Sequence, residues 1–164
     1  MGLDIYINKF SKEEYRKHKI RNEQLDIIYA QQEKTESDEE YAKLEKQANE
    51  LSKEYPGGIS VEVGYFRKNW SLFYKMRDLY PGYFDNAHYT HQLTKKDVET
   101  ILRDCQQVLD YPASAEELMP NNASTTIDRD GWYFVKIHDI MQCMAKLRDT
   151  VDWNNEVVEY HESY

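Results

Sequence analysis

Two pairs of side chains in this sequence have residue types that could recognise an anionic ligand. Arg67 and Lys68 flank an aromatic run, and a cation beside aromatic rings attracts a phosphate-like group through charge and stacking. On the helix that we expect here, Arg67 shares a face with Tyr74. Trp132 and Tyr133 open a second predicted helix, whose first N–H groups favour an anion. These five residues form a candidate ligand site.

A plainer interpretation of Arg67 stays open. We expect an extended segment at residues 59–63 and then a core helix to about residue 80, buried through Phe66, Trp70 and Phe73. The opposite face of that helix would be solvated. Arg67 would then only take part in an exposed ladder toward Asp78, which contributes little.

A second feature is the acidic end of the chain. The formal net charge is −9, and residues 149–164 contain no Lys or Arg. One interpretation is a solvated sheet edge that resists aggregation. The other is an acidic strip that docks on a basic surface of another protein. The residues concerned are Asp149, Asp152, Glu156, Glu159 and Glu162.

The remaining reactive side chains do not form a recognisable catalytic set. His88 and His91 are three apart, but in an extended segment they point to opposite faces, and a metal site needs three or four ligands. Cys105 and Cys143 lie within helical patterns and are typical small core residues. The sequence contains no G-x-S-x-G, HExxH, CxxC or Gly-rich phosphate loop. We therefore expect no metal and no cofactor, and we favour a non-enzymatic role.

Bulk composition indicates one folded domain. The chain has 164 residues, 40% of them hydrophobic, and 14 are Tyr, so it can bury a core without disulfides. No apolar run approaches the ~18 residues of a membrane span, and no signal peptide is visible. We expect a cytoplasmic location and no membrane contact. The acidic charge argues against direct nucleic-acid binding.

Periodicity predicts an α+β fold. Residues 3–8 and 157–164 alternate apolar and polar side chains as strands do, and we expect them to pair. Capping boxes at Ser11 and Ser37 predict two helices in a hairpin. We expect stripes of Ile20, Ile27 and Ile28 on the first helix and of Tyr41, Leu44, Ala48, Leu51 and Tyr55 on the second.

The remaining elements complete this arrangement. A Thr94 cap predicts a helix to about residue 109, one helical turn fits residues 115–118, and a long helix fits residues 130–152. Residues 121–126 are polar and are expected to form a loop or a short strand. The expected architecture is a small antiparallel sheet including both terminal strands, with helices on one face. We predict a single domain of residues 1–164, with residues 11–55 as a projecting helical-hairpin insertion.

The order of several motifs resembles a family of small uncharacterised proteins of phages, prophages and their bacterial hosts. The motifs are MGLDIYI, EVGYFRKNW, KKDVETILRDCQQVL, ELMP, DRDGWYF and EVVEYHESY. The family's central motif reads Tyr-Trp-Arg-Lys-Ala-Asn with a His soon after. Here residues 65–70 match that motif, and Phe73 occupies the position of the family's His. Compared with the family pattern, these departures remove two polar groups from this part of the sequence. The resemblance implies a phage setting in a bacterial cytoplasm and brings no known activity.

Three functional hypotheses follow. The leading one is a non-enzymatic interaction protein of phage type that contacts a host protein through the acidic strip, the Tyr-rich surface and the hairpin. The second is a binding protein or modest enzyme for a nucleotide-like anion at Arg67, Lys68, Trp132 and Tyr133. The third is a structural homodimer formed through the hairpin stripes.

Overall fold

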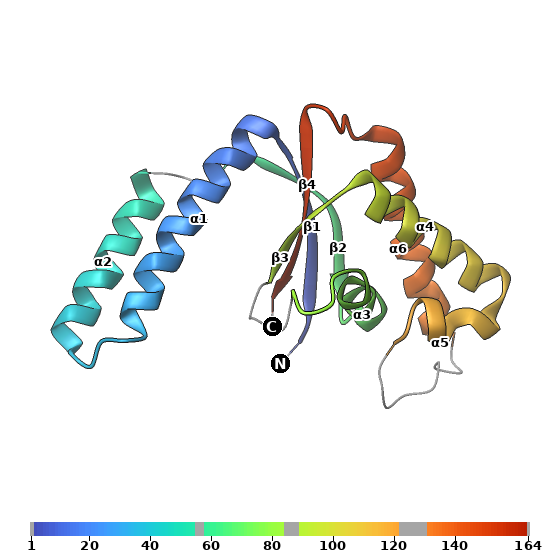
Figure 1. Cartoon of the computed structure of the whole chain (residues 1–164), viewed down its shortest axis with the longest axis horizontal. Helices are drawn as coiled ribbons and strands as arrows, with labels where there is room; N and C mark the ends of the chain where they lie inside the picture. The colour runs from blue at the N-terminus through green and yellow to red at the C-terminus, as the bar shows by residue number, and fades with distance from the viewer. Residues whose placement is uncertain (1, 55–57, 84–88, 122–130, 164) are drawn as a thin grey trace. The chain divides into compact units, whose positions relative to one another are not determined.

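The structure is a computed structural model that describes residues 2–54, 58–83, 89–121 and 131–163. Two compact units divide the chain: Met1–Lys9 together with Glu62–Tyr164, and Phe10–Val61. Figure 1 labels the elements. In chain order they are β1 (Asp4–Ser11), α1 (Lys12–Gln32), α2 (Asp38–Glu54), β2 (Ser60–Arg67), α3 (Trp70–Leu79), β3 (Thr90–Leu93), α4 (Lys95–Asp110), the 3-10 turn Pro112–Ser114, α5 (Ala115–Leu118), α6 (Trp132–Thr150) and β4 (Glu156–Ser163).

The four strands form one antiparallel sheet in the order β2-β1-β4-β3. The first and last strands of the chain are therefore neighbours, which confirms the predicted pairing (Figure 1). β3 pairs with β4 in the register Thr90↔His161 to Leu93↔Val158. Because β2 and β3 end the sheet, each has one edge without a neighbouring strand among the described residues.

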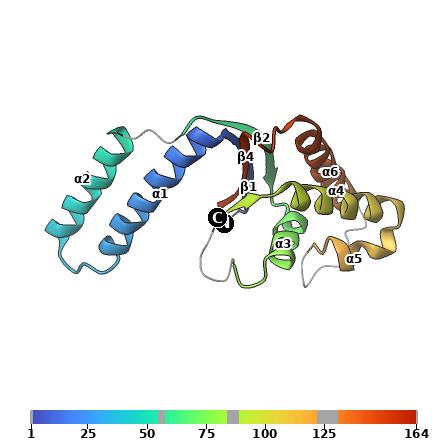
Figure 2. The ribbon, with the colours of Figure 1, turned by 45° about the horizontal axis from the view of Figure 1, so that its top comes forward.

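Helices α3, α4 and α6 cover one face of this sheet, as predicted (Figure 2). Every second side chain of the terminal strands enters the core between them, because strand side chains alternate between faces. The α4 capping box forms as expected, with Thr94 and Asp97 exchanging hydrogen bonds. The largest fully buried side chains here include Leu3, Ile5, Ile7, Leu72, Met76, Leu93, Ile101, Met119, Tyr133, Ile137, Ile140 and Tyr160.

The segment before α3 corrects the sequence prediction. We expected a helix from about residue 64, but strand β2 continues to Arg67 and the helix begins at Trp70. Lys68 breaks the strand with a φ of 52°, in the left-handed region. Asn69 then caps α3, since its side-chain oxygen accepts from the Leu72 N–H at 3.2 Å. Phe66 and Arg67 consequently belong to a strand, and the predicted helix face shared by Arg67 and Tyr74 does not form.

The unit Phe10–Val61 contains the predicted helical hairpin. On α2, Leu44 and Ala48 of the predicted stripe are buried. The apolar stripe of α1 differs from the prediction, because its buried residue is Leu25. Ile20 and Ile27 are exposed instead, at 41% and 60%. Near the start of α1, the Glu14 carboxylate accepts a hydrogen bond from the Ile59 N–H at 2.8 Å.

Two predicted segments fall on residues outside the described ranges. These are His88 of the histidine pair and nearly all of the polar segment 121–126. His91 lies on β3 with its ring 3.8 Å from the Tyr80 ring, and burial holds its pKa below the ordinary value. Over the described ranges, no group of three His, Cys, Asp or Glu side chains is placed to hold a metal ion. The helices there also contain no stretch long and apolar enough to cross a membrane.

Candidate functional site

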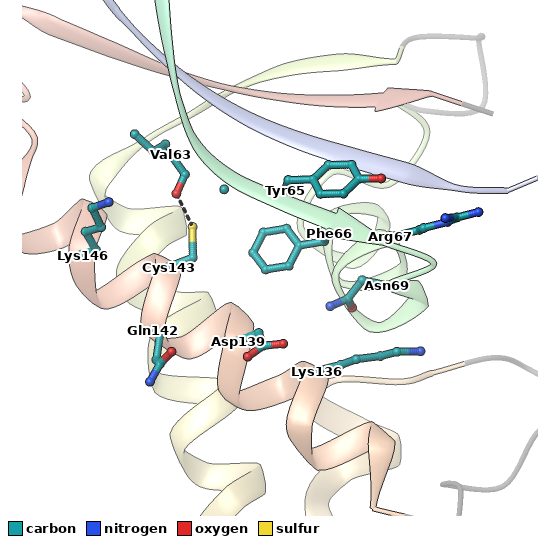
Figure 3. A pocket seen from close by; sticks show the side chains of 11 residues that line it. Val63, Tyr65, Phe66, Arg67, Asn69, Lys136, Asp139, Gln142, Cys143 and Lys146 are labelled. Carbon is teal, nitrogen blue, oxygen red and sulfur yellow. Dashed lines mark hydrogen bonds between the residues drawn. The ribbon is translucent and has the colours of Figure 1, made fainter.

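An open groove of about 390 Å³ lies between edge strand β2 and helix α6 (Figure 3). We call it the β2–α6 groove. Its strand side is formed by residues 63–67 and by Asn69, which caps α3. Its helix side is a stripe of residues spaced three or four apart, which places them on one face of α6. That stripe consists of Lys136, Asp139, Gln142, Cys143 and Lys146.

A glycine allows the two walls of the groove to approach each other. A Cβ at Gly64 would lie 2.7 Å from the Cys143 sulfur and 3.2 Å from the Phe66 ring, too close for a real side chain. The isolated Gly in a strand therefore marks a close approach between elements. The Cys143 thiol also donates to the Val63 carbonyl at 3.6 Å (Figure 3). Burial raises its pKa to about 11, so it stays a thiol at neutral pH.

The outer edge of β2 faces this groove. The Lys68 N–H donates to the carbonyl of Leu3, the residue before β1, at 2.6 Å. In an antiparallel strand both backbone groups of a residue point to the same side, and the side alternates along the chain. The backbone groups of residues 63, 65 and 67 therefore point away from β1. The thiol contact with the Val63 carbonyl agrees with this orientation.

Asn69 presents a polar group to the groove from the protein interior. The residue is 2% exposed, and its side-chain oxygen is used in the α3 cap. No group among the described residues accepts a hydrogen bond from its amide nitrogen. In Figure 3 that nitrogen points toward the space between Phe66 and the side chains of α6. Among the described residues, the buried side-chain polar atoms without a partner are Arg21 Nε and Trp153 Nε1, so the Asn69 nitrogen keeps contact with solvent, and an acceptor on a ligand would replace water there.

The groove carries a net positive charge in an acidic protein. Its lining contains three cations, Arg67, Lys136 and Lys146, and one carboxylate, Asp139. In the part of the chain that the structure describes, none of these cations forms an ion pair. The Lys136 ammonium does donate to the Lys68 carbonyl at 3.3 Å, at the turn with positive φ. The cationic side chains are thus available to an external anion.

The structure places only part of the predicted ligand site at this groove. Arg67 lines it, although its guanidinium extends away from Phe66 in Figure 3, and Lys68 forms the turn beside it. Tyr74 and Trp132 are not among the lining residues. Tyr133 is 1% exposed, and its hydroxyl donates to the Met119 carbonyl at 2.7 Å. Tyr133 therefore belongs to the core and cannot stack on a ligand.

The acidic C-terminal residues do not form a continuous exposed strip. Glu162 is 1% exposed and accepts two hydrogen bonds from Arg77, at 2.8 and 3.1 Å. Glu159 is also buried, at 5%. The other three residues also have partners: Glu156 pairs with Lys9 of β1, Asp149 pairs with Arg148, and Asp152 accepts hydrogen bonds within the turn before β4.

Sequence reasoning missed the helix side of the groove. The stripe of α6 that carries Lys136 and Lys146 was visible as the polar side of a well-predicted core helix. The second available signal was Gly64, an isolated Gly in a run of strand-forming residues. The mistaken helix over residues 64–69 hid both signals, because it removed the sheet edge along which they lie.

Comparison with protein-family models, with curated proteins and with solved structures finds no match for this chain.

Proposed function

We propose that this protein is a binding protein that holds an anionic group of its ligand in the β2–α6 groove. The observation that carries the proposal is a groove lined by Lys136, Lys146 and Arg67, none of which pairs with a carboxylate of the described residues, into which the Asn69 amide nitrogen also points. A negatively charged oxygen placed there would receive a hydrogen bond and favourable charge interactions at once. The groove volume of about 390 Å³ is within the range of ligand pockets.

This proposal modifies the hypothesis of anion binding and keeps Arg67 and Lys68 as neighbours of the site. It replaces Trp132 and Tyr133 by Lys136, Lys146 and Asn69. The hypothesis of an acidic docking strip has less support, because Glu159 and Glu162 are buried. The phage-type setting and a host protein as partner stay proposals.

The test uses a fluorescein-labelled hexaglutamate peptide as probe and anisotropy as the readout. We expect saturable binding that weakens as salt is added, because exposed charges are screened. The variant Lys136→Ala/Lys146→Ala should lose about tenfold or more in affinity. The matched control is Lys95→Ala/Lys96→Ala, which removes the same charge from two exposed lysines at the start of α4. Absence of saturable binding, or an equal loss in both double variants, would refute the proposal.

A second variant separates the amide from the fold. Asn69→Asp keeps an oxygen for the α3 cap, since Asp caps helices as well as Asn. It replaces the free donor by a carboxylate oxygen that repels an anion. We expect some loss of thermal stability from the poorly exposed charge, and loss of probe binding at temperatures where the variant stays folded. Retained binding would show that the amide does not face the ligand.

The exposed isoleucines of the hairpin favour a second candidate function. Ile20 and Ile27 are seven residues apart on α1, so they share a face, and both remain exposed within the chain. A second copy of the hairpin could cover them. Sedimentation of the native protein and of the variant Ile20→Glu/Ile27→Glu tests this hypothesis. The native protein should sediment as a dimer and the variant as a monomer.

A further inference from the structure

We propose that the ligand of the β2–α6 groove is an extended acidic peptide segment of a partner protein, which adds to the sheet as a strand beside β2. This inference rests on the proposed function and states the chemical class of its ligand. Three features of the groove support it: the open backbone edge, the spacing of the two lysines, and the charge between them.

The open edge offers a specific kind of partner. The backbone groups of Tyr65 and Arg67 point away from β1, and among the described residues they have no hydrogen-bond partner. This edge presents N–H donors and C=O acceptors in alternation. A peptide backbone satisfies both kinds of group, as it does when peptides add to exposed sheet edges in other proteins. A phosphodiester chain carries acceptors only and would leave the carbonyls unpaired.

The helix side sets the length of the segment. Lys136 and Lys146 are ten residues apart on α6, which separates their Cα atoms by about 15 Å. An extended chain covers that distance in about 4–5 residues. Side chains at positions i and i+4 of a strand point to the same face. The groove therefore matches two acidic residues spaced four apart, each near one lysine.

The charge in the middle of the groove determines which residues of the peptide can lie between the two acids. Asp139 is situated between the two lysines in the α6 stripe, so it disfavours a carboxylate at position i+2 of the peptide. A small anion such as pyrophosphate is too short to reach both lysines. A chain charged at every unit, whether hexaglutamate or a nucleic acid, also places negative charge beside Asp139, so in a protein with a net charge of −9 we expect it to bind more weakly than two separated acids. The pattern of two separated acids is what this surface favours.

The test uses labelled seven-residue peptides and the full chain. The parent is acetyl-Thr-Glu-Thr-Val-Thr-Glu-Thr-amide, with its acids four apart, and a matched peptide of the same composition has them three apart. We expect the parent to bind at least about tenfold more tightly than the matched peptide. Hydrogen exchange of the Tyr65 and Arg67 amides should slow when the parent binds.

Backbone methylation distinguishes strand addition from charge alone. Two versions of the parent carry N-methyl groups on alternate residues, one on the odd and one on the even positions. Strand addition uses only one set of amides, so one version should bind like the parent and the other should not.

Three other results have separate meanings. Equal binding of both methylated versions would refute strand addition and leave the anion site standing. Failure of every peptide, hexaglutamate included, would refute the proposed function itself. Binding of a short oligothymidine that depends on Lys136 and Lys146, without binding of the parent peptide, would overturn the peptide assignment in favour of nucleic acid.

Discussion

Lys75 of α3 and Lys146 of α6 have the same side chain in opposite surroundings. Lys75 is 7% exposed, and its ammonium lies 2.6 Å from the carboxylate of Asp104, which is 3% exposed. Lys146 is exposed at the mouth of the β2–α6 groove, and no carboxylate of the described residues pairs with it. One lysine is thus used inside the fold, and the other is available to a ligand.

Two other cations, Arg77 and Lys9, are intermediate in exposure between Lys75 and Lys146. Arg77 is partly exposed and holds the buried Glu162, with its guanidinium also 3.3 Å from the centre of the Phe73 ring. Lys9 and Glu156 are about a quarter exposed and join β1 to β4. Because the cost of an unpaired charge rises with burial, stability should depend on these cations in the order of their burial.

The largest effect is expected at Lys75. The variant Lys75→Met leaves the buried Asp104 carboxylate with only Arg103, whose side chain is 69% exposed. We expect a loss of about 3 kcal/mol in the free energy of unfolding, measured by urea denaturation. The double variant Lys75→Met/Asp104→Leu should regain most of that loss. If the double variant were as unstable as the single one, the loss of stability would come from altered packing and not from an unpaired charge.

The next effect is expected at Glu162. Its carboxylate accepts from both terminal nitrogens of Arg77 and from the Tyr160 hydroxyl at 2.5 Å. Glu162→Gln keeps the shape but turns one acceptor into a donor that opposes Arg77. We expect a loss of about 2 kcal/mol in thermal unfolding, and no change for Glu116→Gln on the surface. Unchanged stability of Glu162→Gln would show that this pair does not hold α3 to β4.

A smaller, pH-dependent effect is expected at Glu156. The hydrogen bond from Lys9, and then the Asp152 N–H, hold the pKa of this carboxyl below its ordinary value of 4.5. The folded state therefore keeps the carboxylate ionised when the unfolded state already takes up a proton, and the contribution is lost as pH falls below 4.5. Glu156→Gln should cost less than about 1 kcal/mol at neutral pH. Its deficit in urea denaturation should vanish in acid, and a constant deficit would contradict the assignment.

The sequence predicted the fold better than the site, for physical reasons. The core stripe of α6, from Tyr133 to Leu147, repeats at helical spacing, so burial and period agree there. The stretch around Phe66 contains aromatics whose spacing also fits a helix, and only Lys68 with its positive φ and the Asn69 cap end the strand. Such a local break depends on tertiary packing.

Charged residues were harder still to place. The sequence shows Glu162 in a segment without cations, but its partner Arg77 lies 85 residues away. The composition of the last strand indicates a solvated surface, but the charge of Glu162 is neutralised by a cation from α3. The same reasoning applies in reverse to the groove, where the cations of α6 were ordinary surface residues until the sheet edge beside them was known.

The smallest effect on stability is expected at the groove lysines. Lys146→Ala and Lys136→Ala should each change the free energy of unfolding by no more than about 0.5 kcal/mol, because neither side chain is paired with a carboxylate in the described structure. The same two variants should cause the greatest loss of peptide binding. Lys75→Met should do the opposite and bind the peptide normally at temperatures where it stays folded. If Lys146→Ala destabilised the protein as much as Lys75→Met, the groove lysine would be part of the fold, and its free charge could not be attributed to a ligand.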